Sequence, residues 1–167
     1  MERSWQLAQM NIATLVADAG DPVVQPFFDA LAEVNALAES RPGFVWRLKD
    51  EVADNATSIA ATADPRLIVN MSVWDSAEAL FDFVYRSAHT AIMARRREFF
   101  GKPPEGRAYQ VLWWVPAGTE PTVSEGLAKL WHLDRFGPTP LAFTFKQRFE
   151  MPGRTPAGLD EAATAEV

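Results

Sequence analysis

The sequence contains no cysteine. This absence excludes disulfide bonds, zinc sites built on thiolates and catalytic cysteine nucleophiles. Histidine is almost as scarce, because His89 and His132 are the only two and neither has histidine-rich surroundings. The sequence therefore does not predict a tightly bound metal ion.

Several other signatures are absent as well. The chain has no GxGxxG or GxxxxGK(S/T) phosphate-binding motif, no HExxH motif and no GxSxG nucleophile motif. No apolar run approaches the ~18 residues of a membrane span, and no secretory leader is recognisable. A net charge of −6 offers no basic surface for nucleic acid. We therefore expect a cytoplasmic protein that binds neither membranes nor nucleic acid.

The composition that remains is typical of a globular domain, with 48% hydrophobic and 23% charged residues. We assign this domain to residues 1–150. Residues 151–167 hold too few apolar side chains to pack, so we predict a disordered C-terminal tail there. Aromatic residues make up 11% of the chain. They favour either an aromatic core or a pocket or subunit interface with aromatic lining.

Strands are predicted where apolar and mixed positions alternate. This alternation is clearest in the first and third of the four predicted strands, at residues 6–13, 44–49, 66–74 and 108–115. A polar stretch, residues 50–64, connects the second strand to the third.

Helices are predicted from apolar spacing and cap residues. Asp21 followed by Pro22 is typical of a helix start, and the helix should run to the Pro42-Gly43 stop. A second helical region begins at Asp75 or Ser76 and extends to Phe100, with a break near Ser87.

The resulting order, β-α-β-β-α-β, predicts a ferredoxin-like α+β fold, an antiparallel sheet with two helices on one face. A helix opening at Ser124 and a fifth strand over residues 141–149 follow it. The other sheet face must then be covered by a second sheet or remain wet. Gln9, Asn11, Asn70, Ser72 and Trp74 share one face of the predicted strands. We interpret this polar and aromatic face as a ligand cavity that a homodimer encloses.

Four strings give the chain a family resemblance. They are VWDSAEALFDFVYRSAH (73–89), RRREFF (95–100), LWWVPAGTEPTVSEGLAKL (112–130) and GPTPLAFTFKQRF (137–149). Together they resemble the DUF3291 family of bacterial proteins from about Leu7 to Phe149. This resemblance implies a dimeric α/β barrel, and the family as a whole carries no assigned activity.

A more distant similarity concerns VWDSAEAL followed by a helix with a histidine, which resembles the antibiotic-biosynthesis-type monooxygenases of the same superfamily. That superfamily also includes haem-degrading monooxygenases, muconolactone isomerase-like proteins, dehydratases and polyketide cyclases. The fold alone does not choose among these activities. The haem-degrading members place an Asn, a Trp and a His in positions where this chain has Asn11, Phe83 and His89. Phe83 in place of Trp argues against haem degradation.

His89 is the main catalytic candidate, as a general base or, less favourably, a haem ligand. The alternative is a structural contact at the helix break. Asn11 and Asn70 can orient a carbonyl or an enolate through their amides, or can bond across strands at an interface. Trp74 is a candidate substrate-binding residue, with core packing as its alternative.

Three further candidates have weaker support. Trp113 and Trp114 point to opposite faces of one strand, so at most one lines the cavity, and Trp113 is the candidate. Tyr85 can donate a phenolic proton to a substrate oxyanion. Arg95, if it points inward, can bind a carboxylate or enolate, although solvated arginines are the simpler interpretation of residues 95–97.

These residues favour a cofactor-free enzyme: a monooxygenase, isomerase or cyclase that acts on an aromatic or polyketide-like small molecule. The alternatives are a non-catalytic ligand-binding or structural dimer domain and a haem-binding protein.

Overall fold

The computed structural model describes residues 4–153. Nine elements follow one another in this part of the chain: β1 (Trp5–Thr14), α1 (Gln25–Glu39), β2 (Phe44–Arg47), β3 (Leu67–Trp74), α2 (Ala77–Arg86), α3 (His89–Ala94), α4 (Arg96–Phe99), β4 (Gln110–Pro116) and α5 (Val123–Phe136). Most of the predicted C-terminal tail lies outside the described residues.

The four strands form one antiparallel sheet in the order β2-β3-β1-β4. β1 is central and pairs with β3 on one side and with β4 on the other. This strand order, together with the β-α-β-β-α-β sequence of elements, is the ferredoxin-like fold, so the predicted fold class is confirmed.

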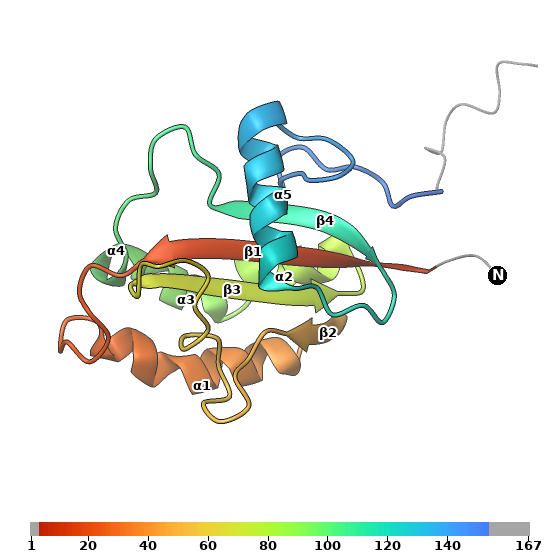
Figure 1. The fold of residues 1–167 in the computed structure, drawn as a ribbon. Coiled ribbons are helices and arrows are strands. Elements are labelled where there is room, and N and C mark those ends of the chain that lie inside the picture. The colour runs from red at the N-terminus through yellow and green to blue at the C-terminus, as the bar shows by residue number, and fades with distance from the viewer. Residues whose placement is uncertain (1–3, 154–167) are drawn as a thin grey trace, which may run out of the picture.

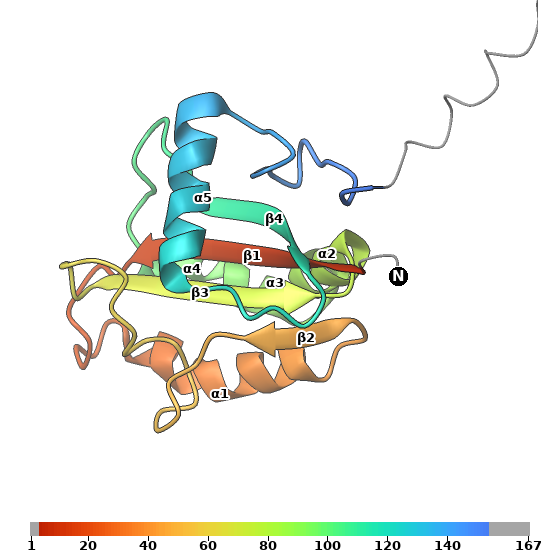
Figure 2. The same ribbon diagram turned by 45° about the vertical axis from the view of Figure 1, so that its right-hand side comes forward.

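Helices cover both faces of the sheet (Figures 1 and 2). α5 lies on one face, where Leu130 and Leu133 pack against the buried strand residues Met10, Met71 and Trp113. α1, α2, α3 and α4 lie on the other face. The prediction that one sheet face stays free of helices is therefore wrong, because the same chain supplies α5 to cover an apolar face.

The first helix begins later than the Asp21-Pro22 pair predicted. The Asp21 carboxylate accepts a hydrogen bond from the Val23 backbone N–H at 2.9 Å, and the Val24 N–H donates to the Asp21 carbonyl at 3.1 Å. These bonds form a turn, and α1 starts only at Gln25, with Pro26 in its first turn.

The predicted break near Ser87 is confirmed. Ser76 caps α2 by accepting from the Ala79 N–H, and Ser87 at the other end is fully extended, with φ −125° and ψ 178°. A second break at Arg95, which the pattern did not predict, separates α3 from α4.

The predicted fifth strand over residues 141–149 is wrong. Only Phe143 pairs with the sheet, through two backbone hydrogen bonds of 2.9 Å with Leu112. The buried Phe143 ring instead packs against Trp114 and Phe149, and the Trp114 indole N–H donates to the Phe149 carbonyl at 2.8 Å. Aromatic packing therefore holds this segment without a strand ladder.

Candidate functional site

A cavity of about 520 Å³ lies between the sheet and the helices α1, α2, α3 and α4. This volume lies within the range of small-molecule sites. Helices of the same chain cover this polar sheet face, so the expectation that a second sheet or solvent covers it is wrong. That a homodimer helps to enclose the cavity stays a prediction.

Three amide side chains form a row on the cavity face of the sheet. Asn70 on β3 lies directly opposite Asn11 on β1, and Asn11 lies opposite Gln110 on β4. Residues opposite each other in antiparallel strands share a face, and all three line the cavity. Within residues 4–153 none of these amides forms a hydrogen bond with another side chain, so their donors and acceptors are available to a ligand.

The polar side chains next to these amides form hydrogen bonds with one another. The Gln9 amide and the Trp74 indole N–H both donate to the Ser72 hydroxyl, at 3.0 and 2.9 Å. The Trp74 ring is fully buried and stacks on Phe83 with 5.2 Å between centroids. The Trp74 ring is therefore a fixed part of the cavity wall, and its indole N–H already has a hydrogen-bond acceptor in the Ser72 hydroxyl.

His89 is held at the start of α3. Its ring lies 4.7 Å from the Phe83 ring, centroid to centroid, and its Nδ1 faces the Val84 carbonyl at 3.4 Å. A carbonyl oxygen only accepts, so the neutral ring that makes this contact carries its proton on Nδ1 and its lone pair on Nε2.

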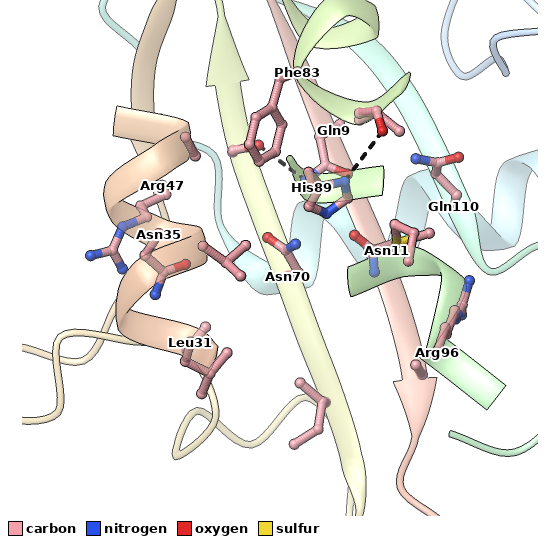
Figure 3. A pocket seen from close by; sticks show the side chains of 18 of the residues that line it. Gln9, Asn11, Leu31, Asn35, Arg47, Asn70, Phe83, His89, Arg96 and Gln110 are labelled. Carbon is pink, nitrogen blue, oxygen red and sulfur yellow. Dashed lines mark hydrogen bonds between the residues drawn. The ribbon is translucent and has the colours of Figure 1, made fainter. Parts of the chain in front are cut away.

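Burial lowers the pKa of His89 below its usual value of 6.5, and the hydrogen bond to the Val84 carbonyl offsets part of that effect. The imidazole is therefore neutral at pH 7 and able to accept a proton. In the view of Figure 3 its ring projects between Asn11 and Asn70, and all three residues line the cavity.

The charged side chains that line the cavity are both arginines. No Asp or Glu is present among the described lining residues, whereas Arg47 and Arg96 both contribute. Arg47 is buried and neutralised, because its guanidinium bonds Glu39 at 2.7 Å and the Asp54 carboxylate at 3.2 Å. Arg96 makes no ion pair within residues 4–153.

Five of the predicted site residues are brought together by the fold. His89, Asn11, Asn70, Trp74 and Tyr85 all line the same cavity. Their roles there stay predictions.

Two other predicted residues lie elsewhere. Trp113 faces α5, where its indole N–H donates to Glu125 at 2.8 Å, and it does not line the cavity. Arg95 is exposed and pairs with Glu98 at 2.9 Å. The physical reason is the break at Arg95, which turns the next arginine toward the cavity instead.

Sequence reasoning missed Gln110, Arg96 and Arg47 as lining residues. Gln110 carried a signal, since it alternates with Leu112 and Trp114 along β4 and therefore shares their face. No such signal existed for Arg96, because the orientation of a three-arginine run depends on where the helix breaks.

Haem fits this lining poorly. The ring that stands where the haem-degrading proteins have Trp is Phe83, which is buried between Trp74 and His89. The sheet wall opposite is the amide row, where a flat macrocycle would need an apolar surface. As for metals, residues 4–153 contain no group of three His, Asp or Glu side chains arranged to share an ion.

No helix in the described part of the chain is both long and apolar enough to cross a membrane. The fold is a ferredoxin-like domain, and its cavity has a polar and aromatic lining and a volume typical of small-molecule sites.

Residues 6–158 match the family described as "Domain of unknown function (DUF3291)", so the chain belongs to that family. No curated protein matches the chain. The solved structures that resemble it include the following three. NE2512 of Nitrosomonas europaea, of unknown function, is 13% identical over 72% of this chain and 96% of its own, with a TM-score of 0.44. PA3566 of Pseudomonas aeruginosa is 11% identical over 71% and 100%, with a TM-score of 0.44.

The third is SnoaB of Streptomyces nogalater, described as a cofactor-independent oxygenase. It is 16% identical over 69% of this chain and 95% of its own, with a TM-score of 0.41. Values this low do not assign an activity to the chain.

Proposed function

We propose that this protein is a small-molecule enzyme of the cofactor-free type, which removes a proton from a flat aromatic or polyketide-like substrate. The observation that carries the proposal is that His89, whose pKa burial lowers, lines the same cavity as a row of amides that bond no other described side chain. A base and an oxyanion site in one enclosure are the two parts that enolate formation requires.

In the proposed reaction, His89 Nε2 takes a proton from a carbon that is next to a substrate carbonyl or is conjugated with one through an aromatic ring. The electron pair of that C–H bond moves to the carbonyl oxygen and forms an enolate. The side-chain N–H groups of Asn11 and Asn70 donate to this oxygen, where negative charge develops. The imidazolium that forms keeps its Nδ1 proton on the Val84 carbonyl.

The enolate can have two fates. Reprotonation at another carbon, or attack on a second carbonyl of the same molecule, gives an isomerase or a cyclase. In the monooxygenase the substrate carbanion itself reduces O₂ to a hydroperoxide, which loses water to leave a new carbonyl. The substrate is the reductant in that case, so no redox cofactor is needed.

The proposal is tested with anthrone, a tricyclic ketone whose acidic methylene lies between two aromatic rings. Exchange of the methylene protons in D₂O is followed by NMR without oxygen, and oxygen uptake is followed separately in air. We expect His89→Ala to slow exchange by about 10²–10⁴-fold, the usual contribution of a general base. Asn70→Ala should lose about tenfold or more, as one oxyanion donor.

His132→Ala is the matched control. The His132 ring bonds the Thr139 hydroxyl at 2.9 Å and does not line the cavity. If His89→Ala and Asn70→Ala both leave turnover unchanged, or if His132→Ala is equally damaging, the assignment of this site is wrong. Oxygen uptake together with exchange identifies the monooxygenase, and exchange alone identifies the isomerase or cyclase.

A further inference from the structure

The arginine run at residues 95–97 divides its three side chains among different surroundings. Arg95 is exposed and bonds both oxygens of the Glu98 carboxylate, at 3.1 and 2.9 Å. Arg97 is exposed. Arg96 alone is half-buried and lines the cavity.

Arg96 also stands at the junction of two cavities. A second cavity of about 340 Å³ shares Arg96 and Tyr109 with the first. The Arg96 guanidinium lies 5.0 Å from the centroid of the Tyr109 ring. In Figure 3 Arg96 lies on the α4 side of Asn11, whereas Arg47 lies across the cavity beside α1. In this view a cation thus stands on the same side of the cavity as Asn11, away from Asn70.

The charge balance of the lining makes this cation unusual. The whole chain carries a net charge of −6, yet none of the described lining residues is acidic. Arg47, the other lining arginine, is neutralised by Glu39 and Asp54. Arg96 is therefore the lining guanidinium whose charge no carboxylate within residues 4–153 compensates. A partly buried cation of this kind favours an anionic ligand group.

We propose that the cavity takes aromatic carboxylates and that Arg96 binds the carboxylate group. The guanidinium fork can donate two parallel hydrogen bonds to a carboxylate. The contact with the Tyr109 ring helps to hold the Arg96 side chain in place. This inference rests on the proposed function only in using the same cavity as the ligand site, and it adds the substrate class.

The test measures binding and does not require turnover. The probes are 2-naphthoate and its uncharged isostere 2-naphthamide, titrated calorimetrically at pH 7 into the wild-type protein and its variants. We expect naphthoate to bind the wild type about tenfold more tightly than naphthamide, which is the scale of one charge-assisted hydrogen bond. Arg96→Gln should abolish the difference and leave naphthamide binding unchanged.

Two further variants separate binding from a structural role. Arg97→Gln removes a neighbouring exposed charge and should keep the preference for naphthoate. Arg96→Lys retains the positive charge without the planar guanidinium and should keep part of the preference for naphthoate. If Arg96→Gln and Arg96→Lys weaken both probes equally, Arg96 only supports the fold, and the proposal is overturned.

The outcomes also separate this inference from the proposed function. If both probes bind the wild type equally, or if Arg96→Gln keeps the preference, selection by Arg96 is wrong and His89 chemistry is unaffected. If neither probe binds the wild type, the proposal of aromatic carboxylates as ligands is wrong, and the anthrone exchange assay decides the proposed function separately.

Discussion

Replacement of Gly43 by alanine should destabilise the protein through a contact that the structure defines closely. Gly43 precedes β2 and has a φ of +84°, in the left-handed region. A Cβ atom added there would lie 2.5 Å from the Cβ of Ala79 on α2. Neither the backbone of β2 nor the short Ala79 side chain can move aside freely. The Gly43 carbonyl also accepts the Asp75 N–H at 2.8 Å, which ties the two segments together.

The expected cost has two parts. A non-glycine residue in the left-handed conformation costs about 1–2 kcal/mol, and overpacking adds about 1–3 kcal/mol. Gly43→Ala should therefore lower the free energy of unfolding by about 2–5 kcal/mol. Gly118→Ala is the matched control, because Gly118 has a φ of +80° and nothing within 4 Å of the added Cβ. The control should cost only about 1–2 kcal/mol.

Urea unfolding followed by tryptophan fluorescence measures both variants. With a slope of about 2 kcal/mol per molar urea, Gly43→Ala should lower the midpoint by about 1–2.5 M and Gly118→Ala by about 0.5–1 M. Equal shifts in the two midpoints would show that β2 does not approach α2 this closely. Because Phe44 lines the cavity next to Gly43, Gly43→Ala should also weaken naphthoate binding.

Three other predictions concern the surroundings of the cavity. Arg47→Met should lower the free energy of unfolding by about 1–3 kcal/mol, because the Arg47 guanidinium joins β2 to Asp54. It should also speed proteolysis within residues 50–64. Unchanged cleavage in this segment would contradict the link. The lowered pKa of His89 means that the unfolded chain binds a proton more readily, so stability should fall as the pH drops below about 6.5. His89→Phe should flatten that dependence, measured by urea midpoints from pH 5 to 8, whereas a slope equal to that of the wild type would argue against a buried neutral imidazole. Haemin titration should produce no Soret band; a saturable band lost in His89→Ala would revive the haem-binding alternative.

The strand pattern carried much of the information about the site. A period of two placed Asn11 and Asn70 on one face of their strands, and the register then paired them directly. The helix break at Ser87, which brings His89 to the start of α3, was also readable, since serine competes for backbone hydrogen bonds. In these cases the deciding interactions are local or lie between neighbouring strands.

Other parts of the site depend on contacts between distant segments. Gln110 joins the amide row only because β4 pairs with β1 in one register. Arg96 turns inward only because α4 begins after a break at Arg95, where the carboxylate of Glu98 holds the preceding arginine outside.

By itself the sequence determined the ferredoxin-like order of elements and the polar character of one sheet face, because hydrophobic periodicity and cap residues act within a few positions of the chain. The tertiary structure decided that helices of the same chain cover both faces of the sheet. α5, far from β1 in sequence, covers the apolar sheet face, and Gly126 lets it approach the buried Met10 side chain. Which helix covers which face depends on long-range burial of apolar surface, and no local pattern specifies that pairing.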